Sequence, residues 1–228
     1  MEIVLTTLGA FLGALLSLLA TIFIEYQKKP KLNFEIESPP LDEEGGPEKH
    51  FGDSRILRVR VSNKPMPELL RWLDRSAAFH CTGNVQFHHE NGAAVFSHPM
   101  VIRWSDSEEP YSAQAMQVGK IPVILKSPDL TKYFAAAWRD LFPGHYKFMD
   151  VAARYGEEDD CFGLSIDSYW SENRSPDFKL SKGRYLVTVT IHSSGNNVSH
   201  FFALENSVSR KDFRLTSASK READMLRS

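Results

Sequence analysis

The chain has 228 residues, of which 42% are hydrophobic and 25% charged, a composition that excludes disorder over its whole length. A formal charge of −2 leaves no broad basic field, so we expect no nucleic-acid partner. The two cysteines, Cys81 and Cys161, lie far apart in sequence and match neither a disulfide framework nor a zinc-ribbon spacing.

The first element in the chain is an apolar segment, IVLTTLGAFLGALLSLLATIFI, at residues 3–24. It contains no charged residue, and as a helix it is long enough to cross a hydrocarbon core of about 30 Å. We therefore predict a transmembrane helix in contact with the lipid bilayer, within an anchor region of residues 1–30. A cleavable signal peptide is less consistent with the sequence, because only Glu2 precedes the segment and the segment exceeds the usual length of about 7–15 residues.

The charges that flank this segment predict its orientation. Lys28, Lys29 and Lys31 follow the segment, and no lysine or arginine precedes it. Because positive residues are enriched on the cytoplasmic side, we expect the cell membrane as the location, with the N-terminus outside and the C-terminal domain in the cytoplasm. In that reducing compartment Cys81 and Cys161 would remain two buried thiols, whereas an oxidising compartment would allow one bridge.

Small residues recur along one face of the predicted helix. Gly9 and Gly13 form a G-x-x-x-G pair, which Ser17 and Thr21 continue at the same spacing. Such a face lets two helix backbones approach closely, and a homodimer through Gly9, Gly13 and Ser17 is therefore one alternative. The other is an unpaired spanning helix, in which small residues are also common.

Residues 31–208 carry the pattern of short β-strands. Leu32, Phe34 and Ile36 alternate with polar residues, which is the period of a half-buried strand. The other strand-like segments are residues 55–62, the stretch around Val85 and Phe87, and residues 101–104, 117–126, 146–155, 161–170, 183–192 and 199–206. The last two form the clearest hairpin in the chain.

Polar segments and one helix separate these strands. We expect exposed loops at residues 38–54 and 105–116, and a loop with a helical turn packed on the sheet edge at residues 63–74. Asp129 is positioned to cap a short amphipathic helix over residues 129–142. Residues 209–228 are predicted to be a polar tail that frays, with a terminal helix over residues 220–228.

About eight short strands with one helix outside the membrane segment predict a mainly β protein built as an antiparallel β-sandwich. LRVRVSN (57–63), AAFHCTGNVQF (77–87) and KLSKGRYLVTVTI (179–191), followed by HFFALEN (200–206), carry a family resemblance. They resemble the immunoglobulin-like domains that follow a single anchor helix in uncharacterised prokaryotic membrane proteins. The resemblance covers about two-thirds of the chain, and implies an immunoglobulin-like β-sandwich and a membrane location, but no active site.

Metal-ligating residue types gather in one region. His80, Cys81, His88, His89 and His98 lie within one short stretch, and imidazole and thiolate are the usual ligands of zinc or copper. Adjacent residues on a strand point to opposite faces, however, so at most a subset could converge. We expect exposed histidines and a buried cysteine, and no bound metal.

A run of acidic residues is the other cation-binding candidate. Glu157, Glu158, Asp159 and Asp160 lie in a loop between predicted strands, and carboxylates of such loops bind calcium in other proteins. The alternating D-x-D-x-D-G pattern is absent, so we expect a solvated acidic turn. Arg58 and Arg60 alternate with apolar residues along one predicted strand. They could form an anion-binding stripe, but we expect them to lie on the solvent-exposed face of an antiparallel sheet.

No pattern in the sequence indicates catalysis. It contains no G-x-S-x-G nucleophile elbow, no Walker A loop and no dinucleotide-binding fingerprint, so we expect neither an enzyme nor a cofactor. The leading expectation is a membrane-anchored interaction or scaffold protein whose cytoplasmic domain binds a protein partner. The alternatives are an exported domain that binds a small ligand or calcium, and a hydrolase or metal-dependent enzyme of unfamiliar type.

Overall fold

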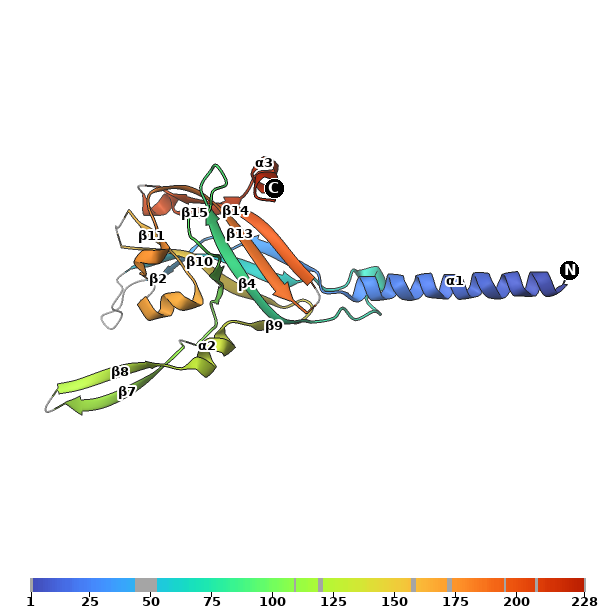
Figure 1. Ribbon diagram of the computed structural model, residues 1–228, viewed down its shortest axis with the longest axis horizontal. Coiled ribbons are helices and arrows are strands. Elements are labelled where there is room, and N and C mark those ends of the chain that lie inside the picture. Colours follow the sequence, from blue (N-terminus) through green and yellow to red (C-terminus); the bar gives the residue numbers. More distant parts are fainter. Residues whose placement is uncertain are drawn as a thin grey trace.

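The protein consists of a long N-terminal helix, a β-sandwich and a hairpin that projects from the sandwich (Figure 1). The structure is a computed structural model and describes residues 2–43, 53–108, 110–118, 121–156, 159–171, 174–194, 196–207 and 209–227. Helix α1, Glu2–Lys28, extends away from one end of the sandwich, and residues 9–23 are exposed along their whole length. Within the described chain, Gly9–Lys28 is the one helix long and apolar enough to cross a membrane.

The first sheet of the sandwich contains seven of the described strands, all paired antiparallel. Its order is β1-β3-β10-β11-β12, and in addition β2 pairs with β3 and β6 pairs with β10. The strands are β1 Leu32–Ile36, β2 Leu41–Glu43, β3 Ser54–Asn63, β6 Arg103–Trp104, β10 Tyr146–Tyr155, β11 Cys161–Gly163 and β12 Lys179–Leu180.

The second sheet contains six described strands in the order β15-β14-β13-β4-β5, with β9 also pairing with β4. These pairings are antiparallel as well. The strands are β4 Ala78–His88, β5 Met100–Val101, β9 Arg139–Leu141, β13 Gly183–Ser193, β14 Asn196–Asn206 and β15 Arg214–Ser217. The protein is therefore mainly β, and two antiparallel sheets follow one apolar helix, as the sequence predicts.

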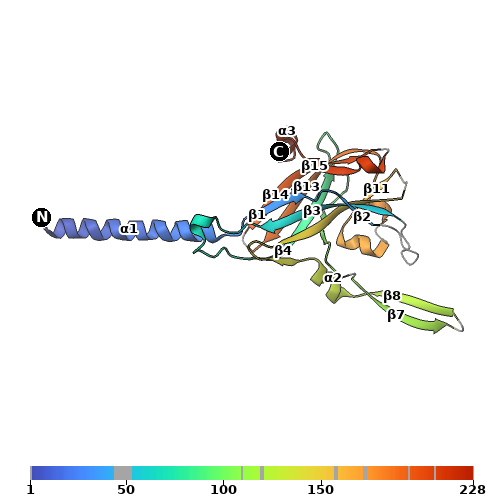
Figure 2. The same ribbon diagram turned by 180° about the vertical axis from the view of Figure 1, so that it is seen from behind.

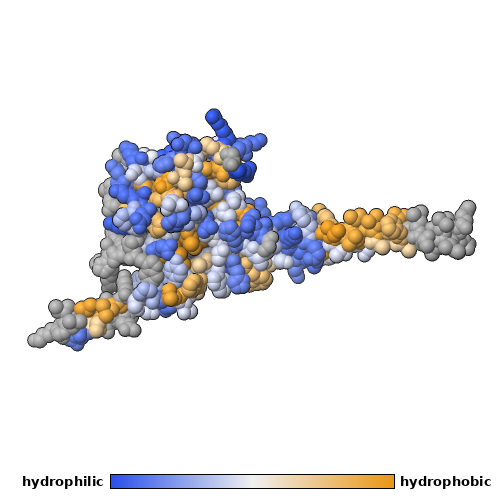
Figure 3. Space-filling model, viewed as in Figure 1, coloured by the Kyte–Doolittle hydropathy of each residue, from blue (hydrophilic) through white to orange (hydrophobic). Residues whose placement is uncertain are grey.

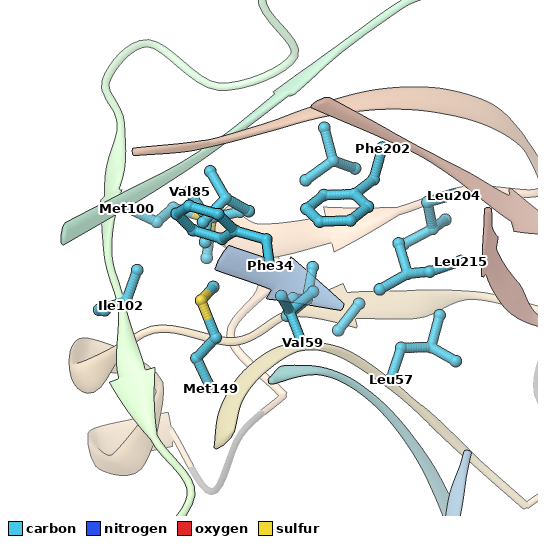
Figure 4. Close-up of a cluster of buried hydrophobic side chains, with 14 of the residues drawn as sticks. Phe34, Leu57, Val59, Val85, Met100, Ile102, Met149, Phe202, Leu204 and Leu215 are labelled. Carbon is cyan, nitrogen blue, oxygen red and sulfur yellow. The ribbon is translucent and has the colours of Figure 1, made fainter. Parts of the chain in front are cut away.

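One hydrophobic core fills the space between the two sheets (Figure 4). Leu57 and Val59 of β3 lie opposite Val85 of β4 and Phe202 and Leu204 of β14, and none of the five side chains is more than 2% exposed. Burying one such side chain stabilises the fold by about 1.5–3 kcal/mol. This gain is available only if every second residue faces inward, which is why the alternating segments of the sequence form these strands.

The expectation of a polar loop at residues 105–116 is wrong for its second half. Tyr111–Val118 forms β7 and pairs antiparallel with β8, Ile121–Pro128, in a separate two-stranded sheet. The register runs from Tyr111 opposite Pro128 to Val118 opposite Ile121. Tyr111, Ala113 and Ala115 alternate with Ser112 and Gln114, a strand period that the expectation of a loop overlooked.

The predicted helix over residues 129–142 is confirmed but shorter. α2 covers Leu130–Ala136, and the carboxylate of Asp129 accepts hydrogen bonds from the main-chain N–H groups of Thr131 and Lys132, as the cap prediction requires. The helix ends early because β9, which follows it, bonds its main chain to β4. The segment at 161–170 is likewise only in part a strand, since β11 ends at Gly163 and a 3₁₀ helix, η2, follows at Ile166–Ser171.

Residues 209–228 were expected to fray, and the structure corrects this for most of the segment. After the 3₁₀ helix η4, Arg210–Asp212, strand β15 pairs with β14 along four residues. Phe213 is fully buried, and this burial holds the segment to the sandwich. The expected terminal helix is confirmed as α3, Lys220–Met225, with a capping box between Ser219 and Glu222. Pro176–Phe178 forms a further 3₁₀ helix, η3.

The helical turn expected within residues 63–74 is also confirmed, as the 3₁₀ helix η1, Glu68–Leu70. Its predicted packing on a sheet edge is wrong, because Leu69 and Trp72 are 93% and 72% exposed. Hydrogen bonds from Arg75 and Ser76 attach the end of this segment to the end of α1, and the two apolar side chains are exposed to solvent.

Candidate interaction surface

The hairpin β7–β8 projects from the sandwich on the side away from α1, as two opposite views show (Figures 1 and 2). Asp129 fixes its base, because its N–H donates to the carbonyl oxygen of Pro110 at 3.1 Å and its carboxylate accepts from the Ser112 hydroxyl at 3.2 Å. The same carboxylate caps α2, and the pKa of Asp129 is lowered chiefly by the N–H of Lys132. One side chain therefore ties the hairpin to the helix that follows it.

One face of the hairpin carries a group of exposed apolar side chains. Met116 pairs with Val123 across the two strands, so their side chains share a face, which Leu125 extends two residues further on. Met116 is 46% and Leu125 50% exposed, and Figure 3 shows hydrophobic surface on this part of the molecule. A two-stranded hairpin is marginally stable alone in water, so a surface that covers this face would stabilise it.

Helix α2, which follows the hairpin in the chain, carries further exposed apolar side chains. Its inner face packs on the sandwich through Ala136, and the hydroxyl of Tyr133 donates to Asp167 at 2.6 Å. Burial and this hydrogen bond raise the pKa of Tyr133 to about 12. The outer face carries Leu130 and Phe134, four residues apart and about two-thirds exposed. We call Met116, Val123, Leu125, Leu130 and Phe134 the arm surface.

An ionic network holds α2 in position. Arg139 donates to Asp106 at 3.0 Å and to the carbonyl oxygens of Ala135 and Trp138 at 2.9 and 2.8 Å, at the end of the helix. Lys147 of β10 donates to the same Asp106 at 2.5 Å. Burial alone would raise the pKa of Asp106, but the hydrogen bonds and charges of Lys147 and Arg139 lower it. These bonds connect the C-terminal end of α2 to β10.

The histidines and the cysteine considered as candidate metal ligands do not converge. His80 and His88 lie eight residues apart on β4, roughly 25 Å at the rise of a strand. His80 is exposed and lies against Trp138, with ring centroids 4.8 Å apart and the rings tilted by 38°, and His98 is exposed and contacts Ser97. Across the described ranges, no three His, Cys, Asp or Glu side chains form a group that could hold a metal ion.

Both cysteines are separate buried thiols. Cys81 donates its S–H to the carbonyl oxygen of Ala78 at 3.3 Å, and burial, with the charge of Asp140, raises its pKa to about 12. Burial also raises the pKa of Cys161 to about 12. Because the thiolate is the reactive form, burial disfavours both residues as nucleophiles.

The candidate calcium ligands are described only in part. Glu157 and Glu158 lie outside the described residues. Asp159 is directed to Arg154, with 3.7 Å between nitrogen and oxygen, and Asp160 forms an ion pair with Lys179 at 2.5 Å. Both described carboxylates therefore have basic partners within the protein.

The arginine stripe of β3 is paired as well. Arg58 binds Glu37 through two nitrogen atoms, and Arg60 binds Glu35, its neighbour on β1. Their guanidinium groups also lie over the rings of Phe148 and Tyr146, 4.8 and 5.0 Å from the centroids. This is the polar outer face of the sheet that the alternation predicts, and glutamates of β1 and the residue after it balance its positive charges.

A cleft of about 250 Å³ lies between the β1–β3 edge and β15. Arg55, Arg58, Lys211 and Arg214 line it together with apolar residues. Arg58 is bound by Glu37 and Arg214 by Glu205, so these two cations are already compensated.

Gly9, Gly13 and Ser17 lie on the exposed length of α1, and no atom lies within 4 Å of the Cβ position of either glycine. That face of the helix is open, and its self-association stays a prediction. The arm surface, by contrast, was missed from the sequence. Its available signals were the apolar run at residues 121–125 and the spacing of Leu130 and Phe134.

The chain matches no known family model, no curated protein and no solved structure. The resemblance to immunoglobulin-like domains agrees with the structure at the level of antiparallel sheets after one apolar helix. The argument for function therefore depends on the surface of this chain alone.

Proposed function

We propose that this chain is a single-pass membrane protein with a non-enzymatic role, whose β-sandwich lies on the cytoplasmic side of the cell membrane and binds another protein through the arm surface. The observation that carries the proposal is the arm surface itself, whose apolar side chains lie on the hairpin and on α2 and are partly or largely exposed. Leu125, Leu130 and Phe134 are each at least half exposed. Exposed apolar patches are typical of protein interaction sites.

The composition of the hairpin suggests the chemistry of the partner. Residues 111–128 contain Lys120 and Lys126 and no carboxylate. The complementary surface is an apolar cleft with an acidic rim. The bilayer crossed by α1 does not fit this role, since the hairpin points away from α1 (Figures 1 and 2).

Two features support the cytoplasmic orientation. Lys28, Lys29 and Lys31 follow the apolar segment, which is the bias found on cytoplasmic sides. Cys81 and Cys161 are unbridged and buried, as is usual for proteins of a reducing compartment. The exported, ligand-binding alternative predicts the opposite orientation. Protease protection on membrane vesicles of known sidedness, with a tag after residue 228, distinguishes the two.

Site-specific photo-crosslinking in intact cells tests the arm surface. A photoreactive amino acid at Phe134 is expected to give an adduct of discrete mass with another protein. The adduct should disappear when Met116→Asp and Leu125→Asp are added, because charges on the hairpin face would have to be desolvated in the complex. The control position is Lys182, which is exposed on a loop between β12 and β13.

Three outcomes contradict the proposal. The first is no adduct from Phe134, and the second is an adduct that Lys182 gives equally. The third is an adduct with twice the mass of the chain, which would identify a second copy as the occupant. Circular dichroism of the double variant confirms that its sandwich is folded, so that loss of the adduct reports on binding.

A further inference from the structure

The segment 64–76 is bound to the C-terminal end of α1. The N–H of Ser76 donates to the carbonyl oxygen of Lys28, and the guanidinium of Arg75 donates to that of Lys29, both at 2.8 Å. Arg75 is only 6% exposed, so its cation is enclosed beside the terminal carbonyl groups of the helix. A positive charge there also compensates the helix dipole. We call residues 64–76 the collar.

The collar presents two large apolar side chains outward. Leu69 is 93% exposed and Trp72 72% exposed, whereas Leu73, also in the collar, is buried. Figures 1 and 2 show the η1 coil, coloured teal, beside the last turn of α1. Leucine and tryptophan are large apolar side chains, and leaving both exposed to water is unfavourable.

The attachment fixes the depth of the collar if α1 spans the bilayer. The apolar segment ends at Ile24, and Tyr26, Lys28 and Lys29 follow it within the next turn and a half. This is the position of the headgroup region, where tryptophan and tyrosine are enriched because their rings are apolar and their N–H or O–H groups bond to water. If α1 spans the bilayer, the bonds of Ser76 and Arg75 to Lys28 and Lys29 bring the collar to this depth.

The charges around the collar fit an anionic leaflet. Four exposed cations, Lys29, Lys31, Lys64 and Arg71, surround it. Exposed carboxylates here are Glu25, Glu68 and Asp74, of which Glu25 lies 3.8 Å from Lys28. Within the collar Lys64 and Arg71 are matched by Glu68 and Asp74, so the net positive charge beside it comes from the lysines that end α1. Basic residues at this depth are attracted to anionic headgroups.

We propose that the collar inserts Leu69 and Trp72 into the headgroup region of the bilayer that α1 crosses, and so forms a second membrane contact. This inference rests on the proposed function, in which α1 is a membrane span. One helix alone leaves a domain free to tilt on its stalk. Two contacts joined by the hydrogen bonds of Ser76 and Arg75 hold the sandwich in one orientation, with the hairpin directed away from the membrane.

Spin labelling of the full chain in nanodiscs of phosphatidylcholine and phosphatidylglycerol tests the proposal. Single cysteines replace Leu69, Phe134 or Leu16 in turn, each of which is exposed in the structure. Cys81 and Cys161 are fully buried and stay unlabelled under native conditions. For each label, the collision rate with oxygen, which concentrates in lipid, is compared with that of a water-soluble nickel chelate.

We expect the label at Leu16 to favour oxygen most strongly, the label at Leu69 to be intermediate, and the label at Phe134 to favour the nickel chelate. If Leu69 behaves like Phe134 while Leu16 is immersed, the collar proposal fails and the span stands. If Leu16 is also accessible to the chelate, the span itself fails, and the collar proposal with it. Protection of Leu69 from both reagents would place it against protein and overturn the proposal.

Discussion

Replacing Asn63 with alanine is expected to lower the free energy of unfolding by about 4 kcal/mol, because one side chain connects the end of the anchor, the collar and the sandwich. Asn63 ends β3 and is fully buried. Its Oδ1 accepts from the N–H of Lys31 at 3.1 Å, and its Nδ2 donates to the carbonyl oxygens of Ser76 and Leu141, both at 3.0 Å.

The magnitude follows from what the truncation leaves behind. The bond to Leu141 is fully buried, and its unpaired carbonyl would cost about 1–3 kcal/mol. The bonds to Lys31 and Ser76 are partly buried, and each would cost about 0.5–1.5 kcal/mol because water replaces part of the interaction. The total lies at about 2–6 kcal/mol. For a protein of this size the melting temperature should fall by roughly 10 °C.

Thermal unfolding of the full chain in detergent micelles, followed by near-ultraviolet circular dichroism, measures this loss. Asn197→Ala is the matched control, since Asn197 is exposed and its amide oxygen contacts His192 on the surface. The control should change stability by less than about 0.5 kcal/mol. A loss below about 1 kcal/mol for Asn63→Ala would refute the reasoning, because it would mean that water restores all three bonds.

Gly83→Ala is expected to destabilise the protein by about 2 kcal/mol or more, since the new Cβ would lie 2.4 Å from a main-chain oxygen of β13. If the midpoint of denaturant unfolding stays unchanged, the backbone of β13 does not approach Gly83 this closely. Arg154→Met should lower the free energy of unfolding by about 2–3 kcal/mol, because Arg154 is 1% exposed and donates to a main-chain carbonyl at 2.5 Å. Arg60→Met should lower it by less than about 1 kcal/mol, because the ion pair of Arg60 is exposed. Equal losses of stability in chemical denaturation would show that burial is not decisive. Burial raises the pKa of Cys81 and Cys161 from 9.0 to about 12. Both thiols therefore stabilise the fold below pH 9.0, and this contribution is lost as the pH rises toward 12. Measuring the free energy of unfolding across this pH range detects the loss. In the native protein at neutral pH both thiols should react slowly with a disulfide reagent, and both should react after denaturation; rapid native reaction, or fewer than two thiols in the unfolded chain, would be inconsistent with this structure.

The sequence by itself determined the parts of the fold that depend on local pattern. The uncharged segment at residues 3–24 predicts α1, and the alternation of Leu57, Val59 and Val61 predicts β3 and the inward direction of these side chains. Asp129 predicts the start of α2, because a cap involves only the next three residues. Each of these features is encoded within one turn or one strand, so a single pass along the chain is sufficient to find it.

The surfaces were decided by tertiary structure alone. The sequence shows that Leu125, Phe134 and Trp72 are apolar, but not whether another element covers them. Coverage depends on segments that are distant in sequence, as when Ser76 bonds to the end of α1 and holds the collar away from the sheets. Strands β7 and β15 also depend on pairing with a neighbouring strand, β8 and β14, because main-chain hydrogen bonds define a strand whatever its side chains. Local periodicity therefore determines which residues can form a core, and long-range backbone pairing determines which apolar residues are left to meet a membrane or a partner.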